Sequence, residues 1–314
     1  MHLNKFFEKM QKRKILSIYE KMGYQLLPNL GFTNVTNFCS NVCNTDNLGL
    51  RFNNKKENFQ SIFDENKDSK KNEIIIVGGS TAMGMAASSD QNTLSSLLTS
   101  SSNFHFYNLA VRAYNGFQEL LLAQSLVNKF NNLKKIFILS GVNDLYFFLD
   151  PNFSKRFPGP QVYGNKLYNI KKEHLNYFKR IKFYFEDTKK KEIKEQLSLK
   201  EIIERNLKLW SFFAKSQSVE IVFFLQPFYT WSLDIENRKT QKEKMNYGKS
   251  EIMDKLDDSH GLIKEIIKNA CLKNNIEFKD LNEIKMDNEG IFVDRAHLND
   301  KGFEKIANEL IKFI

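Results

Sequence analysis

Short apolar runs alternate with helical sequence along most of this chain. The runs are rich in β-branched and aromatic residues, and they occupy residues 74–77, 104–109, 136–139, 219–225 and 276–281. Such short apolar runs are typical of strands that are buried on both faces of a parallel sheet. Helical patterns lie between or after them, at residues 91–98, 117–130, 201–216, 250–274 and 299–314. The alternation predicts an α/β fold in which helices cover both faces of a five-stranded parallel sheet.

Two stretches interrupt this alternation, at about residues 146–198 and 227–248. Both follow the carboxyl end of a predicted strand, which is the edge where open α/β sheets bind their ligands. They are therefore either substrate-recognition segments or surface excursions. Gln226 starts the second stretch and is a candidate substrate contact for the same reason.

Residues 1–72 are expected to form an extension that precedes the regular domain or packs on it. Apolar side chains recur at roughly helical spacing between lysines over residues 3–26, which predicts a helix there. This helix either packs on the main domain or lies on a membrane surface as a basic amphipathic helix. Residues 27–72 are mixed in composition and are expected to be dominated by loops.

Composition and charge narrow the function classes. The 314 residues carry a formal net charge of +10, but the lysines are dispersed and no nucleic-acid-binding motif accompanies them. Nucleic acid is therefore not an expected partner, whereas an anionic substrate or surface stays open. The sequence shows neither a transmembrane run nor a signal-peptide pattern. Its three cysteines (Cys39, Cys43 and Cys271) make no disulfide framework or metal motif, which favours reduced thiols and a cytoplasmic location.

A serine follows two glycines directly after the first apolar run, in Gly78-Gly79-Ser80-Thr81. Glycines allow a sharp turn, and such a turn would present the serine hydroxyl at the carboxyl edge of the sheet. Three other glycine motifs do not fit. A P-loop would need Lys followed by Ser or Thr after Gly84, the dinucleotide fingerprint would need glycine in place of Ser80, and the α/β-hydrolase elbow would need glycine in place of Ala82.

Two more polar segments lie at the same predicted edge of the sheet. Asn143 follows the third strand within Ser140-Gly141-Val142-Asn143-Asp144, and its side-chain amide could donate to a developing oxyanion. Asp294 and His297 lie just before the last helix, and their spacing of three lets one turn present both side chains. Histidine is the natural base for a serine nucleophile, and a carboxylate would orient its ring. Taken singly, each segment could equally be a structural turn or helix cap.

Together, the three segments resemble the SGNH (GDSL-like) hydrolases. Gly78-Gly79-Ser80-Thr81 is similar to the first conserved block in its Gly-Gly-Ser-Thr variant, and residues 141–144 are similar to the third, Gly-x-Asn-Asp. Asp294-x-x-His297-Leu298 is similar to the fifth block. The resemblance covers residues 73–314, and Leu48-Gly49-Leu50-Arg51 is similar to a stretch that precedes the catalytic domain in some bacterial members.

This resemblance implies a three-layer α/β/α domain with a flavodoxin-like sheet, and it implies roles for individual residues. Ser80 would attack an ester carbonyl, His297 would act as its base, and Asp294 would orient His297. The oxyanion hole would use the backbone N–H of Ser80, the side chain of Asn143 and a backbone N–H from the second block. No metal and no organic cofactor would be required.

The second block, which the resemblance places at residues 108–116, departs from the family pattern. A glycine is expected near Ala113, and the nearest one, Gly116, stands three residues further on. Alanine keeps its N–H, so either residue could supply the second oxyanion donor. Arg112 beside this loop could meet an anionic substrate or form a surface ion pair.

The resemblance implies a serine esterase acting on a small-molecule or glycan ester. An O-acetyl group on a carbohydrate is the first guess, because many relatives with the Gly-Gly-Ser-Thr variant look like polysaccharide-modifying enzymes. The alternatives are an O-acyltransferase to a sugar hydroxyl, a lipid esterase, and a non-catalytic binding module that retains the fold. The oligomeric state is not predicted.

Overall fold

The computed structural model describes residues 15–27, 29–55, 58–64, 71–150, 197–233, 251–284 and 290–314. Residues 3–14 of the predicted N-terminal helix and most of the two predicted interruptions lie outside the described residues. Within the described part of the chain, no helix is long and apolar enough to cross a membrane.

Five parallel strands form the central sheet, in the order β6-β5-β7-β8-β9. In chain order this is 2-1-3-4-5, the order of flavodoxin-like sheets. The strands are β5 (Glu73–Gly78), β6 (His105–Asn108), β7 (Leu133–Ser140), β8 (Glu220–Leu225) and β9 (Glu277–Asp280). Each coincides with a predicted apolar run, and the predicted fold class is confirmed.

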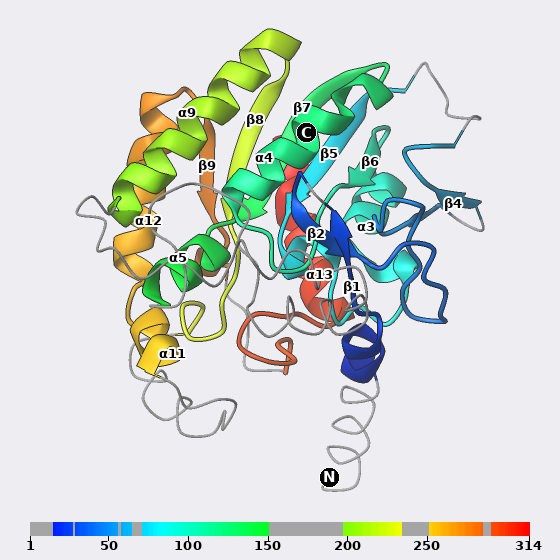
Figure 1. The fold of residues 1–314 in the computed structure, drawn as a ribbon, viewed down its shortest axis with the longest axis horizontal. Coiled ribbons are helices and arrows are strands. Elements are labelled where there is room, and N and C mark those ends of the chain that lie inside the picture. Colours follow the sequence, from blue (N-terminus) through cyan, green and yellow to red (C-terminus); the bar gives the residue numbers. More distant parts are fainter. Residues whose placement is uncertain are drawn as a thin grey trace, which may run out of the picture.

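Helices cover both faces of this sheet, as Figure 1 shows for α4 and α9 on the near face and α13 on the far face. The α-helices are α2 (Ser80–Met83), α3 (Leu94–Ser101), α4 (Gly116–Leu126), α5 (Val142–Leu149), α9 (Leu199–Gln217), α11 (Glu251–Asp257), α12 (His260–Lys273) and α13 (Asp300–Leu310). Short 3₁₀ turns are η1 (Asp90–Asn92), η2 (Val127–Lys129), η3 (Leu281–Glu283) and η4 (Ile311–Phe313). The helix predicted over 250–274 is thus two helices, α11 and α12. Asn299 caps α13, and its side chain accepts the N–H of Gly302.

Alternate residues of the strands enter two different cores. In β5, Ile75 and Val77 pack in the cluster that contains α4, α9 and α12, whereas Ile74 and Ile76 pack in the cluster that contains α3 and α13. All four side chains are fully buried. A strand that is covered on both faces has no solvent face, which is why its sequence is a continuous apolar run instead of an alternating one.

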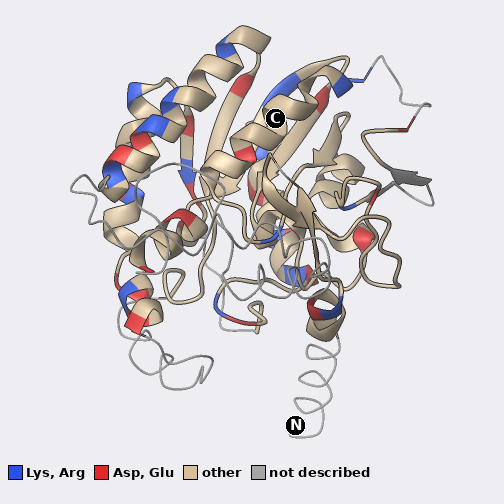
Figure 2. Ribbon diagram, in the orientation of Figure 1, with Lys and Arg blue, Asp and Glu red and all other residues tan. Residues whose placement is uncertain are grey.

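Basic and acidic side chains are interspersed over the described surface, for instance along α9 and α12 (Figure 2). This agrees with the dispersed lysines of the sequence.

The region before β5 differs from the sequence prediction. Residues 15–21 are helical, but the helix stops there and residues 24–26, predicted as helix, belong to a strand. Gly23 lies between the two with φ +66°, a left-handed conformation that ends the helix. The segment predicted as loop-dominated contains two antiparallel hairpins, β1 (Tyr24–Leu27) with β2 (Gly31–Asn34) and β3 (Asn53–Lys55) with β4 (Asn58–Gln60). Strands this short give too few alternating residues to be recognised in a sequence.

A buried arginine ties this N-terminal region to the core. Arg51 Nε donates to Asp90 Oδ1 at 2.7 Å, and its Nη1 donates to the Tyr19 hydroxyl and to the carbonyl oxygen of Gly84, each at 2.7 Å. Its Nη2 donates to Val42 O at 2.7 Å. The side chain of Arg51 is fully buried, so the described part of residues 15–55 is packed on the sheet domain rather than loosely attached.

Candidate active site

Ser80 and the Asp294/His297 pair, which lies more than 200 residues further along the chain, form one hydrogen-bonded row. Nε2 of His297 lies 2.8 Å from Oγ of Ser80, and Nδ1 of His297 lies 2.6 Å from Oδ2 of Asp294. These contacts fit a neutral imidazole with its proton on Nδ1, because Nε2 can then accept from the serine hydroxyl. Both distances lie within the range required of a nucleophile, its base and the group that orients the base.

The glycine turn after β5 places Ser80. Gly78 has φ +153°, and a Cβ at this position would collide with the backbone of Leu139 on the neighbouring strand and with the side chain of Ala82. Only glycine fits so close to β7. The chain then turns, and Ser80 becomes the first residue of α2 at the carboxyl edge of the sheet.

The loop before α13 places the other two side chains, and hydrogen bonds within the loop hold their orientation. Asp294 Oδ1 accepts the backbone N–H groups of Ala296 and His297, both at 2.8 Å. The N–H of Val293 donates to His297 O at 2.8 Å. One oxygen of Asp294 therefore fixes the turn while the other faces the imidazole.

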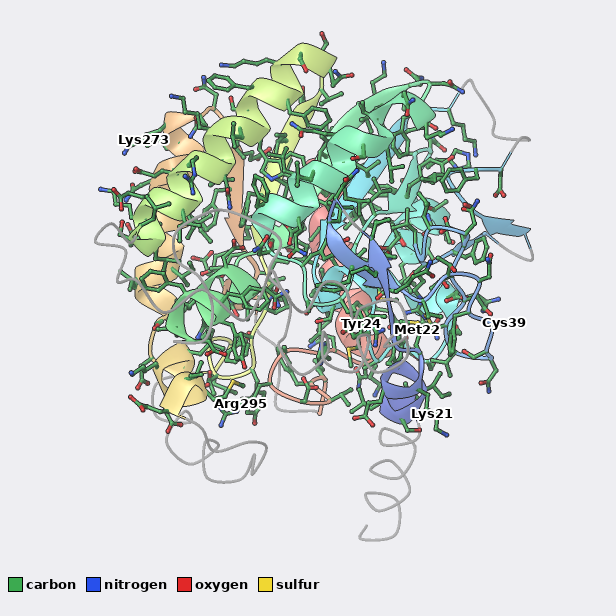
Figure 3. All side chains as sticks on the ribbon, in the orientation of Figure 1. Lys21, Met22, Tyr24, Cys39, Lys273 and Arg295 are labelled. Atoms are coloured by element: carbon green, nitrogen blue, oxygen red, sulfur yellow. The ribbon has the colours of Figure 1, made fainter. Side chains whose placement is uncertain are left out.

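Neighbouring elements hold this loop against the serine. The hydroxyl of Thr81, the residue after Ser80, donates to Ala296 O at 3.0 Å. On the other side, Arg295 forms a buried ion pair with Asp257 of α11 at 3.1 Å, and its carbonyl oxygen accepts the N–H of Tyr229 at 2.8 Å. Figure 3 shows Arg295 pointing away from the sheet at the lower end of the molecule.

Opposing effects set the pKa of Asp294. Burial raises it, but the adjacent His297 and the two backbone N–H groups lower it more, so that the pKa of this carboxyl lies below its ordinary value. The lowered pKa favours the ionised carboxylate, which is the state an orienting group needs.

Several donors converge near Ser80. Within the described residues, neither the N–H of Ser80 nor the N–H of Ala113 has a hydrogen-bond partner. Asn143 Nδ2 donates one proton to Tyr114 O at 2.7 Å, and an amide nitrogen carries a second. The N–H of Gly116 is already occupied, because it donates to both carboxylate oxygens of Asp144 at 3.2 Å.

The backbone at Ala113 keeps the turn for which the sequence resemblance predicts a glycine. Ala113 has φ +64° and is the third residue of a turn closed by the N–H of Tyr114 on Val111 O at 3.2 Å. This turn position ordinarily takes glycine because of its positive φ. Alanine adopts the same conformation at a cost of roughly 1–2 kcal/mol, so the geometry of the loop is kept without the glycine.

The two predicted substrate contacts have protein partners. Arg112 is buried, not on the surface, and its nitrogens donate to Asn34 Oδ1, Tyr19 O and Gly23 O. The surface ion pair considered for Arg112 is therefore wrong, although its side chain does line the pocket at Ser80. Gln226 is also buried and donates to Thr81 Oγ1 at 3.2 Å, which places it behind the site and not among the residues that line the pocket.

A pocket of about 340 Å³ opens in front of Ser80. Its size falls within the usual range for small-molecule sites. The lining combines predicted residues with others that sequence reasoning missed. The lining residues are Tyr19, Glu20, Tyr24, Ser80, Met85, Arg112, Ala113, Asn143 and His297. No motif marks Tyr19, Glu20 or Tyr24, since only the tertiary structure brings the N-terminal region to the sheet edge.

Known proteins were compared with the chain. No protein-family model and no curated protein match it. The chain is similar in structure to an acetyl xylan esterase at 12% identity and a TM-score of 0.44, over 77% of this chain and 99% of the esterase. It is similar to a lipolytic protein of the G-D-S-L family from Veillonella parvula at 14% identity and a TM-score of 0.45, over 76% of this chain and 96% of that protein.

A third similar structure is a two-domain esterase active on acetylated mannans, at 11% identity and a TM-score of 0.43. The match covers 77% of this chain and 48% of that esterase. The chain thus has a low-identity structural similarity to GDSL-like esterases, and the assignment of an activity rests on its own site.

Proposed function

We propose that this protein is a serine esterase that cleaves its substrate through an acyl-enzyme on Ser80. The observation that carries the proposal is the continuous row from Ser80 Oγ through His297 to Asp294, with spacings of 2.8 and 2.6 Å, at the wall of a pocket. If these segments were only a structural turn and a helix cap, nothing would require the Ser80 hydroxyl to contact an imidazole that is also hydrogen-bonded to a carboxylate.

The proposed reaction has two halves. Ser80 Oγ attacks the ester carbonyl carbon while His297 Nε2 takes its proton, and His297 then gives that proton to the leaving alcohol. Water attacks the resulting ester on Ser80 with His297 again as base, which releases the acid and restores the hydroxyl. Asp294 stabilises the imidazolium that forms in each half.

We assign the proposed oxyanion hole to the N–H groups of Ser80 and Ala113 and to the side chain of Asn143. The N–H groups of Ser80 and Ala113 are available among the described residues, which supports this assignment. Gly116, the alternative to Ala113, is a poorer candidate because its N–H already donates to Asp144. Preorganised donors of this kind are worth about 10²–10³ in kcat each. Gln226 is proposed to act indirectly, by orienting the Thr81 hydroxyl that binds the His297 loop.

The proposal is tested with a fluorophosphonate probe, which phosphonylates an activated serine. We expect mass spectrometry to find one label on Ser80 of the wild type, none on Ser80→Ala, and much slower labelling of His297→Ala. Equal labelling of wild type and Ser80→Ala would refute the proposal, as would an unlabelled wild type.

The first substrates to assay are acetylated sugars, following the resemblance described above. An O-acyltransferase would share the acyl-enzyme, so a sugar acceptor is added in increasing amounts. Hydrolysis that continues unchanged supports the esterase, whereas transfer product that rises as hydrolysis falls would reassign the second half-reaction.

A further inference from the structure

One wall of the pocket comes from the N-terminal region instead of the sheet domain. Tyr19 and Glu20 belong to the helical residues 15–21, and Tyr24 begins β1. Figure 3 shows Tyr24 towards the middle of the molecule and Lys21 at its lower edge. Residues of this wall lie in the same pocket lining as Ser80 and His297, so they can contact whatever the serine attacks.

Two buried arginines hold this wall in place. The hydroxyl of Tyr19 accepts from Arg51 and shares its one proton between the carbonyl oxygens of Gly84 and Ala87, at 3.1 and 3.0 Å. Arg112 donates to the backbone carbonyls of Tyr19 and Gly23. A wall fixed by this many bonds is preorganised, as a selective subsite must be.

The charged groups of the wall differ in what they can still bind. The guanidinium of Arg112 donates through Nε, Nη1 and Nη2 to Asn34, Tyr19 and Gly23, which engages three of its five N–H groups. It also lies over the ring of Tyr24, 4.2 Å from the ring centroid. Glu20, by contrast, is exposed and has no hydrogen-bond or ion-pair partner among the described residues. Its carboxylate can accept hydrogen bonds from hydroxyl or ammonium groups, and its negative charge repels anions.

The surroundings favour hydroxyl groups over an ammonium group. Arg112 already places one positive charge against the Tyr24 ring, so a second cation at that ring would meet a like charge. The formal net charge of +10 opposes a cationic substrate as well. A neutral polyol meets neither obstacle, and its apolar C–H groups can pack on an aromatic side chain.

We propose that Glu20 and Tyr24 form the subsite for the alcohol part of the ester and select a neutral, hydroxyl-rich alcohol such as a sugar. The inference rests on the proposed function, because it takes Ser80 to be the attacking group. In this proposal Glu20 and Tyr24 determine specificity. The carboxylate of Glu20 accepts hydrogen bonds from sugar hydroxyl groups, and Tyr24 packs against the sugar ring.

The test compares three acetate esters, namely an acetylated monosaccharide, acetylcholine and para-nitrophenyl acetate. For Glu20→Gln we expect kcat/KM on the sugar ester to fall about tenfold, the effect of weakening one charge-assisted hydrogen bond, and kcat/KM on the aryl ester to stay the same. Tyr24→Leu should likewise lower kcat/KM on the sugar ester and leave kcat/KM on the aryl ester unchanged. Lys21→Gln is the matched control, since Lys21 is exposed and does not line the pocket, and it should match the wild type on all three.

A binding measurement keeps the subsite separable from the chemistry. Titration of the free sugar into Ser80→Ala, with and without Glu20→Gln, needs no turnover. Sugar binding that depends on Glu20, together with a wild type that the fluorophosphonate does not label, would keep the subsite and refute the esterase. Ester turnover in which Glu20→Gln leaves the sugar-to-aryl ratio unchanged, or in which acetylcholine is the preferred ester, would refute the subsite and keep the esterase.

Discussion

Gly79 offers a sharp test of the oxyanion hole because its position leaves no room for a side chain. A Cβ built on Gly79 would lie well under 3.0 Å from Asn143 Nδ2, closer than Cβ atoms approach other heavy atoms. The φ of Gly79 is −87°, so alanine would suffer no backbone strain there. The clash is therefore the main effect of Gly79→Ala, and it acts on the side chain proposed to bind the oxyanion.

The expected loss follows from how far Asn143 must move. Ordinary contact between a Cβ and another heavy atom begins at 3.4 Å, so the Asn143 amide has to move away from the new Cβ by roughly an ångström. A shift of that size is enough to break a hydrogen bond of normal length to the oxyanion. Loss of one such donor lowers kcat by about 10²–10³, or roughly 3–4 kcal/mol. The free energy of unfolding should change far less, since alanine also restricts the unfolded chain by about 0.4–1 kcal/mol in its favour.

The assay is the rate of fluorophosphonate labelling, with the melting temperature measured in parallel. Gly261→Ala in α12 is the matched control, since nothing lies within 4 Å of its Cβ position, and it should label at the wild-type rate. In an Asn143→Ala background, Gly79→Ala should have no further effect. A Gly79→Ala variant that labels within about threefold of the wild type, or that adds its full loss to that of Asn143→Ala, would refute the reasoning.

Three further predictions concern buried groups. Arg51→Met should lower the free energy of unfolding by about 3–5 kcal/mol in a denaturant titration, because it leaves the buried Asp90 carboxylate without its cationic partner. Lys135→Met, which breaks a more exposed pair, should cost less than about 1 kcal/mol. Ala113→Gly should keep the labelling rate because the N–H remains, whereas Ala113→Val, β-branched at φ +64°, should lower the melting temperature; a stable Val variant would contradict this. Burial raises the pKa of Asp144 to about 6, whereas the carboxyl of an unfolded Asp titrates at about 3.9. Between these two pH values the folded protein therefore binds one proton at Asp144 that the unfolded chain does not bind. The free energy of unfolding should therefore fall as the pH rises from about 4 to 6, and Asp144→Asn should flatten this dependence relative to the wild type.

The sequence determined the fold class and indicated the residues that we propose as the reacting groups. A strand covered on both faces must be apolar throughout, so the five strands could be read locally from their composition. Gly78, Ser80 and the Asp294/His297 turn were also recognisable, because a tight turn and a short spacing are local properties. Their common location followed from parallel strands, whose carboxyl ends meet at one edge.

Tertiary structure alone decided what surrounds those groups. Tyr19, Glu20 and Tyr24 reach the pocket through contacts of Arg51 and Arg112 with distant backbone, and long-range contacts leave no periodic signal in a sequence. The same reason explains why Arg112 turned out to be buried and Gln226 to lie behind the site. Whether Ala113 could replace glycine depended on its φ, which neighbouring turns impose. Residue types thus set the available chemistry, while the packing of distant segments set which atoms remain free to carry it out.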